Sequence, residues 1–194
     1  MKKSYFIRTY HIIGWLLLIS MLLLISDVGF RLIGLFLQRQ SNSLMIEYTQ
    51  FLNKHLTIVY KSLQQACMFS VIFTLVLIVP EIIIRIWKDS LTNIFKSIWL
   101  TYHIRNFLKI HVIYEEEESK VKRYNNAVKK AIIDVRDTTV IFIVKLPNEF
   151  GVHGMILDNK EAMREEIANR LPEYSFSNIQ RVKSNIQLEG TRIR

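Results

Sequence analysis

Two long apolar runs limit what this chain can fold into. The first covers residues 12–37 and has an uncharged core from Ile12 to Ile25. The second covers residues 66–87, and its first fourteen residues carry no charge. A helix of 26 residues is about 39 Å long, which exceeds the roughly 30 Å of a bilayer's hydrocarbon core. The sequence therefore predicts two transmembrane helices, the first of them tilted or extending beyond the membrane.

A secretory signal peptide is the alternative interpretation of the first run. Lys2 and Lys3 precede a mostly apolar stretch, as the n-region and h-region of a signal peptide do. However, no A-x-A-like cleavage site follows, and the apolar pattern resumes after Asp27. We therefore expect the first run to remain in the protein as a membrane span.

The basic residues predict the orientation of both spans. Loops rich in Lys and Arg usually face the cytoplasm. The Lys and Arg residues of the segment 38–65 are only Arg39, Lys54 and Lys61, so this segment is expected on the outer side. The prediction is a multi-pass protein of the cell (inner, cytoplasmic) membrane, with residues 1–11 and the part after residue 87 in the cytoplasm. The residues expected at or near the membrane interface are Lys2, Lys3, Arg8, Trp15, Glu81, Arg85, Trp87, Lys88, Lys96, Trp99 and Arg105.

Pro80 and Glu81 interrupt the second run near its end. A charge inside lipid is costly and often functional, so a proton relay is one interpretation of Glu81. Counted as a helix, however, Glu81 lies about 22 Å from Ala66, close to the inner interface. Arg85 follows four residues later, on the same helix face. We therefore expect a Glu81–Arg85 pair that marks the end of the span, with Pro80 as a hinge.

The segment between the two spans, residues 38–65, is expected to be an external amphipathic loop with helical character. Its apolar residues recur at positions 45, 48, 52, 56, 59 and 63, which is helical spacing. Such a helix is expected to continue the spans and to lie on or above the outer surface. The alternative is a receptor surface for an external signal.

Residues 88–114 predict a basic amphipathic segment next to the membrane. Asp89 or Ser90 is expected to cap its helix. The helix is expected to lie along anionic headgroups, or alternatively to pack against other helices of an oligomer. Beyond the helix, residues 107–113 are compatible with either more helix or a short strand, and the sequence does not decide between them. The apolar stripe of the helix consists of Leu91, Ile94, Phe95, Ile98, Trp99 and Tyr102.

The acidic run at residues 115–119 is expected to link this segment to a small cytosolic module over residues 120–194. Helical spacing of apolar residues from Val121 to Ile132 predicts a first helix. The β-branched and aromatic stretch from Val140 to Val144 predicts a buried central strand, which Pro147 ends.

The rest of the module is predicted to contain one more helix and two strands. The segment NEFGVHGM, with two glycines, predicts a loop around His153. Asp158 and Glu161 have the spacing of a capping box at the start of a helix that ends before Pro172. Two strands follow, joined by a tight turn at KSN. The predicted fold class is a membrane protein with two transmembrane helices and a small cytosolic α+β domain of order α-β-α-β-β.

No motif for catalysis, cofactor binding or metal binding stands out in the sequence. The single cysteine, Cys67, cannot form an intramolecular disulfide, and the five histidines lack metal-ligand spacing. The phosphate-loop, H-E-x-x-H and G-x-S-x-G patterns do not occur. We therefore expect a non-enzymatic protein without a cofactor. A candidate partner-docking group consists of Tyr174, Phe176, Arg181 and Lys183, although Phe176 is expected to pack mainly in the core with Ile179 and Val182.

Three stretches carry a resemblance to a known family: TTVIFIVKLPNEFG, EEIANRLPEYSFSNIQR and NIQLEGTR. Together with the order of spans, membrane-proximal segment and module, they resemble the N-terminal membrane and adaptor region of FtsK/SpoIIIE-like DNA translocases. The resemblance is in particular to the coupling proteins of Gram-positive conjugative elements. No position matches the ATPase motor of that family, so the chain is expected to be a motorless relative or a piece of a longer protein.

The resemblance implies a role rather than an activity. The leading hypothesis is a membrane-anchored adaptor that docks a DNA-translocase or conjugative-transfer machine through its module. The expected partners are membrane lipids, a protein partner and further copies of the chain. Contact with nucleic acid is expected to be at most indirect, because residues 115–194 carry fourteen basic against thirteen acidic residues. The alternative is a membrane sensor, which would lose its response if residues 38–65 were exchanged, whereas an anchor would not.

Overall fold

The computed structural model describes residues 4–39, 46–111, 118–147 and 149–193. The chain divides into two compact units between Ile83 and Ile84. The first, called the apolar unit here, contains the residues up to Ile83, and the second, called the sheet unit, contains Ile84–Arg194. The units therefore do not divide at the acidic run of residues 115–119, where the sequence predicted the boundary.

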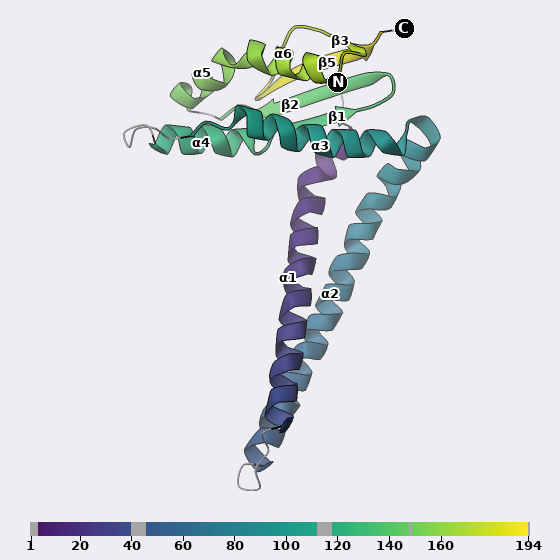
Figure 1. Cartoon of the computed structure of the whole chain (residues 1–194), viewed down its shortest axis with the longest axis vertical. Helices are drawn as coiled ribbons and strands as arrows, with labels where there is room; N and C mark the ends of the chain where they lie inside the picture. The colour runs from purple at the N-terminus through teal and green to yellow at the C-terminus, as the bar shows by residue number, and fades with distance from the viewer. Residues whose placement is uncertain (1–3, 40–45, 112–117, 148, 194) are drawn as a thin grey trace. The chain divides into compact units, whose positions relative to one another are not determined.

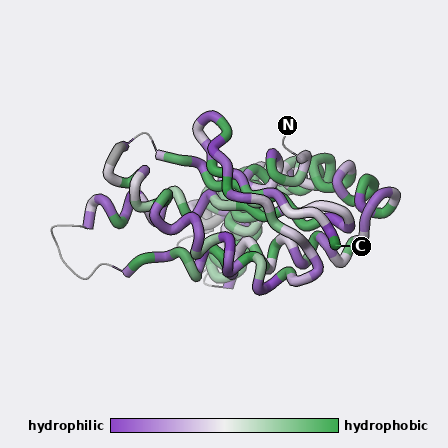
Figure 2. The backbone as a smooth tube through the Cα atoms, turned by 90° about the horizontal axis from the view of Figure 1, so that it is seen from above, coloured by the Kyte–Doolittle hydropathy of each residue, from purple (hydrophilic) through white to green (hydrophobic). Residues whose placement is uncertain are grey.

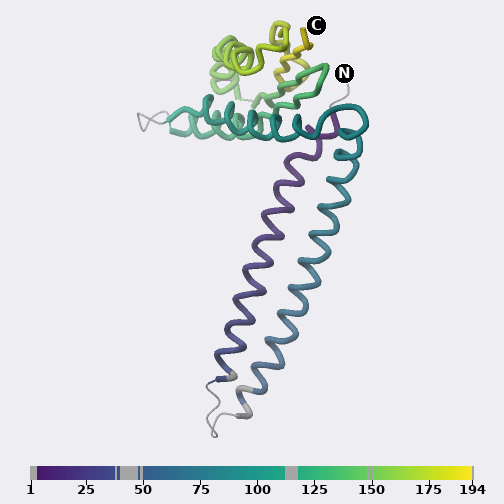
Figure 3. Tube along the Cα trace, turned by 45° about the vertical axis from the view of Figure 1, so that its right-hand side comes forward, coloured from purple at the N-terminus to yellow at the C-terminus, as the bar shows by residue number. Residues whose placement is uncertain are grey.

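The apolar unit consists of two long helices, α1 (Tyr5–Arg39) and most of α2 (Ile46–Lys88). They lie side by side along their length (Figures 1 and 3). Both are long and apolar enough to cross a membrane. Most of their large apolar side chains are exposed, whereas the core helix of a soluble domain would bury them.

Small polar side chains join the two helices of the apolar unit. The hydroxyls of Ser20 and Ser70 lie 2.8 Å apart, and the hydroxyl of Tyr5 donates to the carbonyl oxygen of Leu77 at 3.1 Å. Hydroxyl contacts of this kind are common where apolar helices pack closely in a membrane, since neither lipid nor apolar side chains can satisfy a polar group.

The predicted helical character of the segment between the spans is confirmed for its described part. α2 begins at Ile46, so residues 46–65 form one continuous helix with the second apolar run. Pro80 lies inside α2, and the two units divide three residues after it. The prediction of Pro80 as a hinge remains untested, because the helix continues on both sides of it.

The sheet unit combines four helices with an antiparallel sheet of strand order β1-β2-β5-β3, in which β4 also pairs with β5 (Figure 1). This is the predicted class of a helix-plus-antiparallel-sheet domain after two long apolar helices. The elements are α3 (Leu91–Leu108), α4 (Glu118–Val128), β1 (Ile132–Val135), β2 (Thr139–Lys145), α5 (Phe150–Asp158), α6 (Lys160–Arg170), β3 (Tyr174–Phe176), β4 (Gln180–Val182) and β5 (Asn185–Arg192).

A single core lies between the helices and one face of this sheet. Alternate residues of the two central strands point into it, as the period of two in a strand requires. Hydrophobic and hydrophilic residues are mixed along the elements of this unit, as Figure 2 shows. The buried side chains of the core include Leu100, Ile104, Tyr124, Val128, Ile133, Val140, Phe142, Val144, Val152, Ile156, Met163, Ile167, Ile186 and Leu188.

The central strand was predicted correctly, but the strand before it was missed. The predicted helix from Val121 to Ile132 ends at Val128, and Ile132 begins the four-residue strand β1. Turn hydrogen bonds at Lys129 and Lys130 separate the helix from the strand. Apolar residues on both sides of this turn preserve helical spacing by coincidence, and four residues are too few to reveal a strand period.

The loop predicted around His153 is also wrong, because these residues form α5. Val152 and Ile156, four residues apart, are fully buried and hold the helix on the core. The two glycines of this segment have negative φ angles and act as ordinary helical residues. The capping box is wrong as well: Asp158 is the last residue of α5, and Asn159 occupies the N-cap position of α6 without a side-chain cap.

The end of the sheet unit follows the prediction more closely, except that the first of the two predicted strands is divided into β3 and β4. Ile186 and Leu188 of β5 are buried, and the turn between β4 and β5 falls at KSN, with Lys183 at a φ of 57°. The predicted core position of Val182 is wrong, because this residue is 40% exposed. Residues 112–117, which include part of the predicted strand at 107–113 and most of the acidic run, lie outside the described residues.

Gly190 provides a direct test of packing across the sheet. Phe176 of β3 is paired with Gly190 of β5, and a Cβ atom added at Gly190 would lie 2.6 Å from the Phe176 ring. We predict that Gly190→Ala lowers the unfolding free energy by about 1–3 kcal/mol, the usual cost of overpacking. The measurement is the denaturation midpoint of the full-length protein in detergent.

Gly151→Ala is the matched control for this substitution. An added Cβ at Gly151 meets no atom within 4 Å, and the residue lies in α5. Alanine is favoured over glycine in a helix by about 0.5–1 kcal/mol, so this variant should be as stable as the wild type or more stable. Equal midpoints for the two variants would contradict the packing of Phe176 over Gly190.

Candidate coupling site at the end of α2

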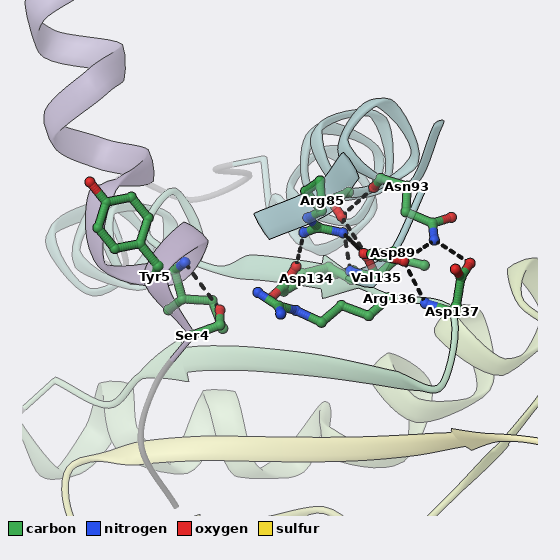
Figure 4. Close-up of polar contacts among 12 residues, drawn as sticks. Ser4, Tyr5, Arg85, Asp89, Asn93, Asp134, Val135, Arg136 and Asp137 are labelled. Atoms are coloured by element: carbon green, nitrogen blue, oxygen red, sulfur yellow. Dashed lines mark hydrogen bonds and ion pairs between the residues drawn. The ribbon is translucent and has the colours of Figure 1, made fainter. Parts of the chain in front are cut away.

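The last turn of α2 is held in the sheet unit by Arg85. This side chain is fully buried, although it lies at the end of an apolar helix. Its Nη2 donates to Asp134 of β1, and its Nη1 donates to Asp89 and, at 2.6 Å, to the carbonyl oxygen of Val135 (Figure 4). One guanidinium therefore connects the end of α2, the short segment that leads into α3, and the first strand.

Asp89 is the second centre of this cluster. One oxygen accepts from the side-chain amide of Asn93 at 2.6 Å and from the backbone N–H of Asp137 at 2.8 Å, while the other pairs with Arg85. Burial acts to raise the pKa of Asp89, but these hydrogen bonds and the charge of Arg85 outweigh it. The net effect is a pKa below the usual value of 3.8, so Asp89 is ionised at neutral pH.

The residues Arg85, Asp89, Asn93, Asp134, Arg136 and Asp137 are called the Arg85 cluster here. Arg136 completes the cluster, because its Nε lies 3.1 Å from Oδ2 of Asp134, while Arg85 contacts Oδ1. A buried charge costs several kcal/mol of desolvation, and only well-directed partners compensate for it. Both oxygens of Asp134 have such a partner, so the cluster fixes one arrangement of the last turn of α2, α3 and β1 rather than adding much net stability.

A second set of polar contacts joins α3 to the edge of β1. The backbone N–H of Val135 donates to the Ser97 hydroxyl at 2.9 Å, and the N–H of Ile133 donates to the Thr101 hydroxyl at 3.0 Å. The Thr101 hydroxyl also lies 3.4 Å from the carbonyl oxygen of Ile133. Two hydroxyls on a helix therefore replace the neighbouring strand that this edge lacks.

The pattern continues at both ends of β1. Arg105 donates from its Nε to the carbonyl oxygen of Ala131 at 2.8 Å. At the other end, the amide of Asn93 donates to the carboxylate of Asp137 at 2.8 Å. We call these four contacts the α3–β1 ladder, in which helix residues 93, 97, 101 and 105 face strand-side residues 137, 135, 133 and 131.

The ladder is possible because the spacing of every fourth residue along a helix nearly equals the spacing of every second residue along a strand. Four residues of a helix advance about 6.0 Å, and two residues of a strand advance about 6.7 Å. Every fourth residue of α3 therefore lies beside every second residue of β1, whose backbone N–H points toward the helix. The two elements run in opposite directions. An unpaired strand edge invites association with other strands, and the ladder removes this edge from solvent.

The ladder reverses the usual orientation of an amphipathic helix. The buried face of α3 contains Asn93, Ser97 and Thr101 beside Leu100, Ile104 and Leu108. The apolar stripe predicted from the sequence lies on the opposite side, where Phe95 is 73%, Tyr102 is 64% and Trp99 is 53% exposed. The helix is capped by Ser90, whose side chain accepts a hydrogen bond from the N–H of Thr92. Of the two predicted caps, Asp89 and Ser90, the structure therefore selects Ser90.

The structure places the remaining predicted interface residues as follows. Arg8, Trp15, Trp87, Lys88 and Lys96 are exposed, and Glu81 is buried. Lys2 and Lys3 lie outside the described residues. Arg105 is half-buried and belongs to the α3–β1 ladder.

Arg85 was predicted to pair with Glu81 as a marker of the membrane exit. Its contacts with Asp134 and Val135, about 50 residues further along the chain, show a larger role than this prediction gave it. The nearest sequence signal is the spacing of Arg85 and Asp89, which are four residues apart on one helix face. Sequence spacing alone cannot reveal a partner on a distant strand.

The candidate docking residues divide into two pairs. Tyr174 is buried and donates its hydroxyl to the carbonyl oxygen of Arg136, and Phe176 packs against the core together with Ile179. The predicted core position of Phe176 is therefore confirmed. Arg181 and Lys183 are exposed on the β4–β5 hairpin and stay candidates for docking.

The site contains charges and hydrogen bonds but no evident reactive constellation. Among the residues that the structure describes, no group of three or more His, Cys, Asp or Glu is arranged to hold a metal ion. Comparison with models of protein families, with curated proteins and with solved structures finds no match to this chain.

We predict that Asp134→Asn destabilises the sheet unit by about 3 kcal/mol or more. The substitution keeps the shape of the side chain but leaves the buried Arg85 without one of its charge partners, which is the costly way to break a buried ion pair. The measurement is the denaturation midpoint of the full-length protein. Arg123→Gln is the control, because the Arg123–Glu149 pair is exposed and should contribute little. Similar midpoints for both variants would contradict the structural role of Asp134.

The ladder is tested by Thr101→Val. Valine has the same shape but no acceptor, so the buried N–H of Ile133 loses its partner at a cost of about 1–3 kcal/mol. Thr191→Val, at the exposed end of β5, is the matched control and should leave the stability unchanged. If the two variants unfold at the same denaturant concentration, Thr101 does not hold the edge of β1.

Proposed function

We propose that this protein is a non-enzymatic, membrane-anchored adaptor that holds a docking domain at the inner face of a cell membrane. α1 and α2 are the membrane spans, and both termini lie in the cytoplasm. The sheet unit binds the partner, which is a protein machine of the DNA-translocase or conjugative-transfer class.

The observation that carries this proposal is the Arg85 cluster. A domain that merely needed to be near a membrane would be connected to its span by a loose linker. Here only Asp89 and Ser90 separate α2 from α3, and both ends of this connection are bonded: Asp89 to Arg85 and Asp137, and Ser90 to Thr92. Such a connection holds the last turn of α2 firmly to α3, which suits an anchor for a machine.

The choice of partner class rests on the sequence resemblance to the adaptor region of FtsK/SpoIIIE-like translocases. Two of the three stretches that carry it, residues 165–181 and 185–192, cover the second half of α6, β3, the first two residues of β4, and β5. The exposed basic residues Arg181 and Lys183 lie at the hairpin between the last two strands. This hairpin is the docking surface of the proposal.

Affinity capture with the full-length, detergent-solubilised protein tests the proposal. The expected result is recovery of a DNA-translocase motor or another DNA-transfer protein by the wild type. Arg181→Glu/Lys183→Glu should lose this partner, because it reverses the charge of the hairpin. The matched control is Lys120→Glu/Lys122→Glu, which makes the same change of charge on the exposed surface of α4.

Two results would contradict the proposal. Recovery of no DNA-transfer protein under conditions that preserve complexes would remove the partner class. Equal loss of the partner from the hairpin variant and the α4 variant would indicate a general charge effect, and the hairpin would no longer be the docking surface.

A further inference from the structure

The outward face of α3 consists of Leu91, Phe95, Ile98, Trp99 and Tyr102. All five side chains are between 43% and 73% exposed. They form one continuous stripe at helical spacing, opposite the residues that contact β1. A soluble protein rarely leaves so many large apolar side chains together on one surface, and such patches mark contacts with a membrane or a partner.

The ladder explains why this stripe cannot turn inward. Rotating α3 to bury the aromatic residues would remove Ser97 and Thr101 from the edge of β1 and leave its backbone N–H groups without acceptors. The helix is therefore fixed with its apolar side away from the core. Apart from the Arg170 side chain over the Trp99 ring, whatever covers the stripe must come from outside the sheet unit.

Three features identify a bilayer surface as the occupant. First, α3 begins three residues after the end of α2, so its first turn lies within about 11 Å of the end of the proposed span. Second, Trp and Tyr are the side chains most favoured at the boundary between lipid and water, and Trp99 and Tyr102 are both exposed here.

The third feature is positive charge beside the stripe. Lys88 and Lys109 are exposed near its two ends. Arg170 of α6 lies over the Trp99 ring, with its guanidinium carbon 5.6 Å from the ring centre. Two acids also lie on this side: Glu166, which pairs with Arg170, and Glu173, which pairs with Lys96. An aromatic stripe bordered by exposed lysines matches the headgroup layer of an anionic membrane.

We propose that the outward face of α3 lies in the headgroup region of an anionic bilayer, so that the helix is a third, interfacial membrane contact. This inference rests on the proposed function, because it requires α1 and α2 to be inserted. The α3–β1 ladder then holds the sheet at a fixed orientation to the membrane, with its opposite edge, formed by β3 and β4, available to a partner.

Tryptophan fluorescence tests this inference, because the chain has only Trp15, Trp87 and Trp99. The variant Trp15→Phe/Trp87→Phe retains Trp99 as its single reporter. It is reconstituted in vesicles of phosphatidylcholine and phosphatidylglycerol, with or without lipids brominated near the headgroup end of the acyl chain. The expected result is loss of Trp99 fluorescence in the brominated vesicles and weak quenching by aqueous iodide.

The variant Trp87→Phe/Trp99→Phe separates this inference from the proposed function. It retains Trp15, which lies in α1. If brominated lipids quench neither Trp15 nor Trp99, the spans are not inserted and the proposed function itself fails. If they quench Trp15 while Trp99 is quenched only by iodide, the anchor stands and the interfacial role of α3 is overturned.

A second copy of the chain is the other occupant that the stripe could accept. In a Cys67→Ser background, Phe95→Cys places a single thiol in the centre of the stripe. The lipid contact predicts no disulfide-linked dimer after oxidation of the reconstituted protein. Rapid formation of a dimer would overturn the proposal in favour of an α3–α3 contact. Glu165→Cys, on α6, reports collisions that are unrelated to the stripe.

Discussion

The edge of β1 is closed by the side chains of a helix, and the arrangement of the sheet unit depends on this contact. An edge strand with free backbone groups needs a partner, and here the partner is a row of polar residues at every fourth position of α3. The row determines how α3 is rotated, and the rotation determines which of its residues face outward. One geometric match between a helix and a strand thus explains both the polar interior face and the aromatic exterior face of the same element.

The same contact extends the sheet unit to include the last turn of α2. α3 shares the core with the sheet through Leu100, Ile104 and Leu108, and the Arg85 cluster adds the last turn of α2 to this body. The domain therefore starts at Ile84, within the last turns of α2, instead of after a linker. The contacts that add this turn to the sheet unit are buried ion pairs and hydrogen bonds. These contacts are directional and do not slide as apolar contacts can.

The sequence predicts the parts of this structure that have a strong local signal. The two apolar helices, the central strand at Val140–Val144 and the turn at KSN follow from hydrophobic runs, β-branched residues and turn chemistry. β1 and α5 were missed because each depends on the tertiary core: β1 is four residues long, and α5 contains two glycines. The coupling site could not be predicted, since Arg85 and Asp134 are 49 residues apart in the chain. A signal was nevertheless present, because Asn93, Ser97, Thr101 and Arg105 recur at steps of four along α3, opposite its apolar stripe.

The central claim is that the end of α2, α3 and the sheet form one cooperative folding unit. Hydrogen exchange of single amides in the full-length protein in detergent tests it most directly. The account predicts that the amides of Ile133 and Val135, which donate to side chains of α3, exchange as slowly as that of Phe142 in the middle of the sheet. The opposite result is fast exchange of Ile133 and Val135 while Phe142 remains protected. It would mean that α3 detaches easily, and that the domain does not begin at the end of the apolar helix.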